Sequence, residues 1–246
     1  IDSYFHSKER AQLSDAPDNA LRRMARDIRL AVPNSVRVTT AADGRSFLEF
    51  LQTTGGGRYR ALLTGAGGGN ALVFGTAVTQ FDVLGPLPLA TGASAVVVGN
   101  VSATATDQPN AYLPVANAYS SRATCSNCAA TPVTIASKSF PLAAEFDSRR
   151  FFLVGGPVSY ECDPSGQVLR RHDGYSISQA QPTPAAGTGI AILSGLTSCS
   201  LTYSAVNQDV GVVSLSVGFV TADDAGNTSS NGGLTLVHHV HVSNTP

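Results

Sequence analysis

The chain has 246 residues, a length that suits one large β domain, alone or with an appendage. Charged residues make up 13% of it and the formal net charge is −1, so no basic excess points to nucleic acid as a partner. No run of about 18 apolar residues is present, which excludes a membrane-spanning helix from the sequence as given.

The first predicted element is an amphipathic helix that ends before Pro33. Ser14 or Asp15 caps its start, and Pro17 occupies the first turn, where its missing N–H does no harm. Apolar residues recur at the spacing of one helix face, which we expect to be buried: Leu21, Met24, Ala25, Ile28 and Val32. The opposite side carries arginines, which we interpret as a solvated polar face: Arg22, Arg23, Arg26 and Arg29.

After Pro33 the pattern becomes that of β-strands separated by turns and loops. Residues 36–40 and 46–53 predict a hairpin, which is followed by a glycine-rich interval. A turn at 163–166 joins a second hairpin, and a loop at 222–233 joins the last two long strands. Two segments rich in Pro, Ala, Asn and Thr are expected to form long surface loops: 101–133 and 178–189. The other strand candidates are 71–74, 95–100, 134–135, 151–161, 168–175, 191–193, 200–206, 212–221 and 234–242.

The four cysteines are predicted to form two disulfides, because an even count in a β-rich chain of exported character is typical of disulfides. We favour Cys125–Cys128, a C-x-x-C that closes a loop, and Cys162–Cys199, which joins two strands. A four-thiolate zinc site is one alternative, although such sites usually contain two C-x-x-C pairs. A thioredoxin-type redox pair at Cys125 and Cys128 is another, although the flanking residues lack the helical periodicity of that motif.

Three other segments carry residue types that occur in ligand sites. Residues 64–70 are rich in glycine but lack the lysine of a P-loop and the G-x-G-x-x-G spacing, so they favour a flexible hairpin turn. His239 and His241 share a strand face and could meet one metal ion, whereas Asp223 and Asp224 offer oxygens for calcium without the spacing of a calcium loop. We expect no metal or cofactor, with calcium at these carboxylates as the alternative, and no catalytic motif indicates an enzyme.

Four segments, in this order along the chain, resemble a known family. The segment DNALRRMARDIRLAVPNSVRV resembles the part that follows the membrane helix in minor type IV pilins and pseudopilins. The nearest likenesses are the MshO-type minor pilins of MSHA-like pili and the J-type pseudopilin of type II secretion. The later segments are similar to that group's cysteine hairpin, its valine-rich strand and its last strand: RRFFLVGGPVSYECDPSGQVLRRHDGYSI, CSLTYSAVNQDVGVVSLSVGF and LTLVHHVHVSNTP.

The resemblance implies an α+β, pilin-like fold. A truncated helical stalk at residues 1–33 would pack on a largely antiparallel, β-rich domain with long loops at residues 34–246. The chain begins at Ile1, so we expect a membrane helix to be missing from its N-terminal side. By the same resemblance, the protein is cleaved and methylated as a prepilin and is held in the bacterial inner membrane with a periplasmic domain. It would move to the pilus tip on assembly.

The function implied by the resemblance is assembly. The chain would be a minor subunit that primes or caps a type IV (MSHA-like) pilus or a type II secretion pseudopilus. Its partners would be other minor and major pilins, through helix bundling, and the assembly platform in the inner membrane. Arg22 and Arg29 are the expected subunit contacts. An exported β-sandwich adhesin or glycan-binding module is the alternative, which the long Thr/Asn/Ser-rich loops support, and a secreted hydrolase with a scattered triad is a third hypothesis.

Overall fold

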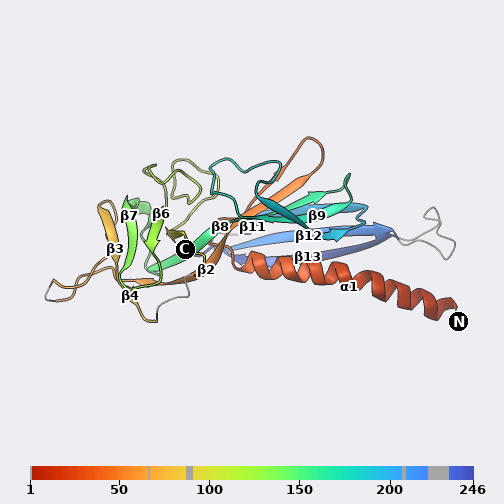
Figure 1. Ribbon diagram of the computed structural model, residues 1–246, viewed down its shortest axis with the longest axis horizontal. Helices are drawn as coiled ribbons and strands as arrows, with labels where there is room; N and C mark the ends of the chain where they lie inside the picture. The colour runs from red at the N-terminus through yellow and green to blue at the C-terminus, as the bar shows by residue number, and fades with distance from the viewer. Residues whose placement is uncertain (1, 66, 87–90, 207–208, 221–232) are drawn as a thin grey trace.

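One α-helix and thirteen β-strands make up the part of the chain that the computed structural model describes, residues 2–65, 67–86, 91–206, 209–220 and 233–246 (Figure 1). Of residues 2–14 only the backbone is described. No helix within these ranges is both long and apolar enough to cross a bilayer. The elements are α1 Asp2–Arg29, β1 Arg37–Thr40, β2 Ser46–Tyr59, β3 Ala77–Phe81, β4 Val83–Leu84, β5 Ala95–Val98, β6 Arg122–Asn127, β7 Val133–Ser139, the 3-10 helix η1 Leu142–Ala144, β8 Arg150–Asp163, β9 Val168–Asp173, β10 Thr188–Ser194, β11 Ser198–Ala205, β12 Val210–Val220 and β13 Gly233–Ser243.

The expected α+β, pilin-like class is wrong. Strands account for 48% of the structure and helix for 8%, so the molecule is mostly β. The strands form two antiparallel sheets, one of ten strands and one of three. Segments expected to be glycine-rich turns or surface loops are taken into these sheets: β2 continues beyond residue 53, and β6 lies within 101–133.

Strand β2 is longer than expected because its glycines pair with phenylalanines of β8. Gly56 and Gly57 lie opposite Phe152 and Phe151 in the ladder. A Cβ added to Gly57 would lie 3.0 Å from Cε1 of Phe151, so an aromatic ring covers the position that lacks a side chain. The partner comes from a distant part of the sequence, and the glycine run alone therefore resembles a loop.

Helix α1 begins earlier than expected and runs through Pro17. The residues before Ser14 include Lys, Glu, Arg, Ala and Gln, which are good helix formers, so the helix extends on both sides of Pro17 although a proline removes one backbone hydrogen bond and crowds the preceding turn. The helix ends at Arg29, so Val32 lies beyond it. The backbone N–H of Val32 donates to the carbonyl oxygen of Leu51 at 2.9 Å, which ties the chain after the helix to β2.

Strands β2 and β8, 14 residues each, run side by side along the long axis of the molecule (Figure 1). The large sheet has the order β1-β2-β8-β5-β6-β7-β3, with β9 also paired to β8, β10 to β9 and β4 to β2. Strand β5 pairs with residues 151–154 of β8 and β9 pairs with 159–163, both on the side that β2 leaves free. In the described part of the chain, residues 155–158 have no strand partner on that side, and we call this break the β8 gap.

The small sheet has the order β11-β12-β13 and shares a core with the large sheet and α1. A second cluster fills the opposite end of the large sheet, and a third lies between them. Among the described residues, the apolar packing between the two sheets lies at one end of the molecule. The largest buried side chains include Met24, Ile28, Phe50 and Tyr160 in the first cluster, and Tyr59, Phe81, Phe140 and Phe151 in the second.

Candidate functional site

The apolar face of α1 lies in the first core cluster. Leu21, Met24, Ala25 and Ile28 are at most 2% exposed. Val32 is also buried, but it belongs to the third cluster because the helix has ended before it. The last turns of α1 are therefore fixed by burial, at roughly 1.5–3 kcal/mol for each large apolar side chain removed from water.

A polar contact fixes the same end of α1. Oδ2 of Asp27 accepts hydrogen bonds from the hydroxyl of Tyr160 at 2.8 Å and from Nε of Arg171 at 2.9 Å. Arg171 also pairs with Asp173. Burial and the neighbouring Asp27 carboxylate raise the pKa of Tyr160, so its hydroxyl stays protonated and donates. The sequence pattern gave no sign of this contact, because β8 and β9 supply both donors.

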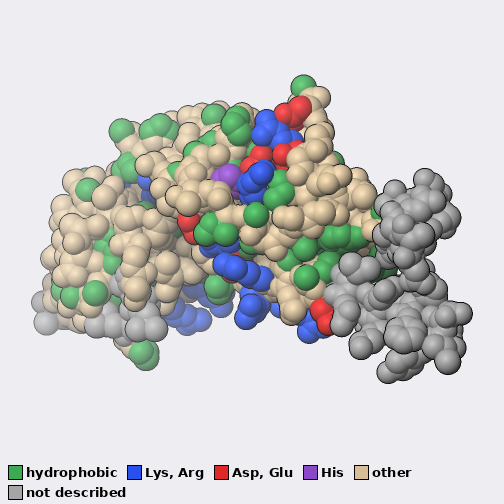
Figure 2. Space-filling model, turned by 45° about the vertical axis from the view of Figure 1, so that its right-hand side comes forward, with side chains coloured by type: hydrophobic (Ala, Val, Ile, Leu, Met, Phe, Trp, Pro, Cys, Tyr) green, Lys and Arg blue, Asp and Glu red, His purple; other side chains and the backbone are tan. Residues whose placement is uncertain are grey.

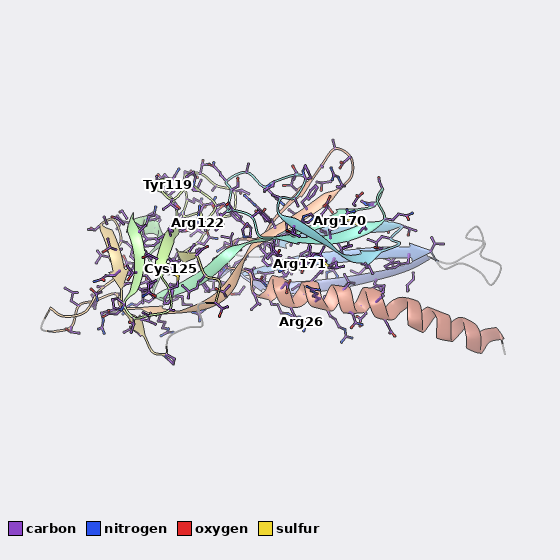
Figure 3. All side chains as sticks on the ribbon, viewed as in Figure 1. Arg26, Tyr119, Arg122, Cys125, Arg170 and Arg171 are labelled. Carbon is purple, nitrogen blue, oxygen red and sulfur yellow. A yellow bond between two sulfur atoms is a disulfide. The ribbon has the colours of Figure 1, made fainter. Side chains whose placement is uncertain are left out.

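The outward face of α1 is cationic. Arg22 pairs with Asp18 at 2.7 Å, although its side chain is 70% exposed. Arg23, Arg26 and Arg29 are exposed, and no residue in the described ranges forms an ion pair with them. Arg26 points away from the strands (Figure 3), and basic side chains gather along the lower edge of the molecule (Figure 2). Of the two expected subunit contacts, Arg29 forms no ion pair with a described residue, whereas Arg22 already pairs with Asp18.

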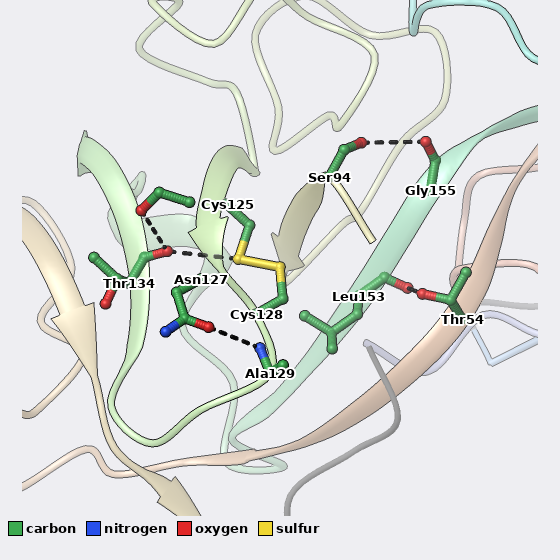
Figure 4. The surroundings of a disulfide bond; sticks show 10 residues. Thr54, Ser94, Cys125, Asn127, Cys128, Ala129, Thr134, Leu153 and Gly155 are labelled. Atoms are coloured by element: carbon green, nitrogen blue, oxygen red, sulfur yellow. Dashed lines mark hydrogen bonds between the residues drawn. A yellow bond between two sulfur atoms is a disulfide. The ribbon is translucent and has the colours of Figure 1, made fainter. Parts of the chain in front are cut away.

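Both predicted disulfides are present. Cys162–Cys199 joins β8 to β11 and thus links the two sheets. Cys125–Cys128 lies at the end of β6, and the sulfur of Cys125 lies 3.5 Å from the carbonyl oxygen of Thr134 in β7 (Figure 4). All four cysteines are in disulfides, so no thiolate is left for the alternative zinc site.

The other ligand candidates are two histidines of β13 and two aspartates. His239 and His241 are exposed on β13, and Nδ1 of His239 lies 2.9 Å from the hydroxyl oxygen of Ser214. Asp223 and Asp224 lie outside the described residues. Among the residues that the structure does describe, no group of three His, Cys, Asp or Glu side chains could hold a metal ion.

The last residue of the glycine-rich segment 64–70, Asn70, is hydrogen-bonded to the carboxylate of Asp82. The backbone N–H and the side-chain amide of Asn70 donate to Asp82 at 3.0 and 2.9 Å, and Nε of Arg60 donates to it at 3.0 Å. These bonds, led by those from Asn70, lower the pKa of Asp82. A negative charge at this point disfavours a phosphate and agrees with a turn.

A groove opens at the β8 gap. Its volume is about 750 Å³, within the range of roughly 300–1,000 Å³ that ligand pockets occupy. Arg122 of β6 and Arg171 of β9 line it from the two sides of the gap (Figure 3). The hydroxyl of Ser94 donates to the carbonyl oxygen of Gly155 at 3.1 Å (Figure 4). The remaining polar lining includes Gln52, Thr54, Thr124 and Ser176.

A buried network holds one wall of the groove. Nε of Arg37 donates to Glu49 at 2.9 Å, and the hydroxyl of Tyr175 donates to the other carboxylate oxygen at 2.9 Å. Arg37 also donates to the backbone carbonyls of Ser178 and Gln179, at 2.9 and 2.7 Å. Burial raises the pKa of Glu49, and the positive charge of Arg37 opposes this rise. The network therefore fixes residues 175–179, which carry Tyr175 to the edge of the groove.

The geometry thus offers two surfaces, the cationic face of α1 and the groove at the β8 gap. No family model, curated protein or solved structure matches this chain. Roles are accordingly assigned from contacts, burial and charge.

Sequence reasoning missed the groove and the network beside it. One local signal existed for the network: Glu49 interrupts the apolar run FLEFL, and a carboxylate in a buried strand needs a partner. The groove has no local signal, because it depends on which two strands pair with β8 and on how far each pairing extends. Arg122 fell in a segment expected to be a loop.

Proposed function

We propose that the chain is a minor subunit that primes or caps assembly of a type IV (MSHA-like) pilus or a type II secretion pseudopilus. The observation that carries the proposal is the placement of α1. Its last turns are held in the core, while its ribbon continues past the ends of β12 and β13 toward the N-terminus (Figure 1). A helix held at one end and extended at the other is suited to bundling with the helices of neighbouring subunits.

The charge of α1 supports the same role. Arg23, Arg26 and Arg29 present cations that no acidic side chain of the described residues offsets. Carboxylates on a neighbouring subunit would complement them, and such complementarity gives specificity and a faster encounter more than affinity. The proposal concerns this role of the helix and does not depend on the α+β class, which the fold contradicts.

The compartment follows from the role. We place the full-length protein in the bacterial inner membrane before assembly, with its β-rich part in the periplasm, and at the pilus tip afterwards. Two disulfides suit an oxidising compartment of this kind. Its partners would be other minor and major pilins and the assembly platform.

Charge reversal on the helix tests the proposal. In the native host, the full-length protein carrying Arg26→Glu and Arg29→Glu should give fewer surface pili by electron microscopy and should lose co-purification with the other minor pilins. The matched control is Arg58→Glu, an exposed arginine of β2, which should change neither readout. Unchanged pili and unchanged co-purification in the helix variant would contradict the proposal, provided that thermal unfolding of the variant matches that of the wild type.

A second candidate function, an exported glycan-binding module or adhesin, is favoured by the groove at the β8 gap. Its lining combines hydroxyl and amide groups with arginine and tyrosine. Deletion of the chain separates the two functions. If the deletion strain loses its pili, the result supports the assembly subunit. If the strain keeps normal pili but its cells no longer bind to a glycan array, the result supports the adhesin.

A further inference from the structure

The β8 gap leaves the backbone of a central strand open on one side. Pro157 and Val158 pair with β2, whereas Gly155 and Gly156 lie at an irregularity in that ladder, and neither β5 nor β9 reaches residues 155–158 within the described chain. Ser94 occupies part of the opening, because its N–H donates to the carbonyl of Val154 at 2.9 Å and its hydroxyl to that of Gly155 at 3.1 Å. Backbone polar groups in the middle of a sheet need partners, and here solvent or a ligand must supply the rest.

Two glycines shape the floor of this opening. A Cβ added to Gly155 would lie 2.8 Å from the carbonyl oxygen of Gly92, and one added to Gly156 would lie 3.3 Å from that of Tyr175. A side chain at Gly155 would therefore displace neighbouring backbone. At these two positions the floor of the groove is therefore made of backbone alone.

The two sides of the groove differ in charge. Arg171 pairs with two carboxylates, those of Asp27 and Asp173, so its side of the groove has no uncompensated positive charge and the Asp173 carboxylate disfavours an anion there. Arg122 contacts only neutral acceptors, the carbonyl oxygens of Ala111 at 2.9 Å and Leu113 at 3.2 Å. No carboxylate among the described residues forms an ion pair with it. One end of the groove therefore carries a cation without a counter-ion.

A second cation strengthens the positive field at this end. The ammonium group of Lys138 is also held by carbonyls, those of Val115 at 2.7 Å and Asn117 at 3.1 Å. Burial lowers the pKa of Lys138, and the positive charge of Arg122 lowers it further. Burial also lowers the pKa of Arg122. An anionic group bound at Arg122 would relieve both effects, because it offsets two partly desolvated cations.

Apart from Arg122, Arg171 and Asp173, the lining is uncharged, and part of it can form hydrogen bonds. Gln52, Thr124 and Ser176 present an amide and two hydroxyls, while Val158 and Ile177 add apolar surface. Ring hydroxyls of a sugar both donate and accept, and its C–H faces pack against apolar groups. We propose that the groove binds a saccharide that carries a carboxylate, with the carboxylate at Arg122 and the hydroxyls at Gln52, Thr124 and Ser176.

NMR titration of the isotope-labelled protein tests this assignment with three probes. They are a disaccharide containing glucuronic acid, the matching neutral glucose disaccharide, and sodium acetate. The acidic disaccharide should shift the amide signals of Gly155, Gly156 and Thr124 and saturate. The neutral disaccharide should bind about tenfold more weakly, because it loses a charge-assisted hydrogen bond. Equal binding of the neutral sugar, equal competition by acetate, or shifts confined to other residues would overturn the proposal.

Variants locate the carboxylate. Arg122→Gln should weaken binding of the acidic disaccharide about tenfold and leave binding of the neutral sugar unchanged. Arg58→Gln, a remote exposed arginine, should change neither. Arg122 also holds residues 111–113, so its replacement could disturb the fold. Thr124→Val and Gln52→Ala test the same site with Arg122 left in place, and each should weaken binding of the acidic disaccharide several-fold. A folded Arg122→Gln protein with wild-type affinity would sink the proposal, as would wild-type affinity in both other variants. The saccharide site does not depend on the role of α1. The binding experiments can therefore fail even if charge reversal on α1 reduces pili as proposed.

Discussion

At the scale of single residues, the main feature is a buried ion pair between Arg37 and Glu49. Arg37 and Glu49 are 6% and 1% exposed and lie opposite each other in the β1–β2 ladder. The guanidinium of Arg37 also lies 3.6 Å from the centre of the Tyr112 ring. Such a pair adds little net stability, since both groups lose water, but removing one partner leaves the other charge buried and unpaired.

We therefore expect Glu49→Gln to lower the free energy of unfolding by about 3–5 kcal/mol. The matched control is Asp43→Asn, which removes a carboxylate that pairs with Arg45; the side chain of Asp43 is 52% exposed. Because solvent screens that pair, the control should change stability by less than about 1 kcal/mol. Urea unfolding of the disulfide-intact protein measures both. Similar effects from the two substitutions would show that burial does not govern the Arg37–Glu49 pair.

At the scale of secondary-structure elements, α1 is connected to the β-strands by one apolar face and one carboxylate. Asp27 is the polar part of this connection, because it accepts from both Tyr160 of β8 and Arg171 of β9. Two strands that are neighbours in the large sheet are thus bound to one helix residue.

Asp27→Asn should destabilise the protein by about 1–3 kcal/mol, because the charge-assisted bond from Arg171 is weakened and a partly buried guanidinium loses a partner. Asp18→Asn on the same helix is the control. Its pairing with Arg22 is solvent-exposed, so we expect a change within about 0.5 kcal/mol. Thermal unfolding followed by circular dichroism gives both values. Equal melting temperatures for the two variants would contradict the role of Asp27.

Elements with a clear local pattern were predictable from the sequence. The turn at 163–166 correctly joins β8 and β9, and the spacing of apolar residues in α1 matches its buried face. Pro17 misled because helix starts favour proline, whereas here the helix continues through it. The glycines of β2 acquire their strand character from β8, a partner far away in the sequence, and the polar residues of β6 acquire theirs from pairing with β5 and β7. The groove could not be predicted, because it is the space between two non-local pairings.

At the scale of the whole molecule, a disulfide cross-links the two sheets. Cys162–Cys199 connects β8 of the large sheet to β11 of the small sheet across 37 residues, whereas Cys125–Cys128 closes only 3. In the chain-entropy model a cross-link restricts the unfolded chain more when the loop is longer. The bridge between the sheets should therefore matter more for stability.

Replacing Cys162 and Cys199 by alanine should lower the free energy of unfolding by about 4 kcal/mol, against about 1.5 kcal/mol for the same change at Cys125 and Cys128. Chemical denaturation of the two double variants, each with the other disulfide intact, measures the difference. A larger loss from the short bridge would mean that native contacts, and not the entropy of the unfolded chain, dominate.

The break in pairing along β8 has a mechanical consequence for the molecule. Between the ends of β5 and β9, the backbone ladder narrows from at least three strands to two, β2 and β8. Resistance to bending falls with the number of hydrogen-bonded strands, so this waist should act as the hinge of the large sheet. Mechanical tension applied at α1 and at the opposite end of the large sheet would concentrate at this two-stranded part. A ligand bound in the groove at the β8 gap would contact both sides of it and reduce its bending.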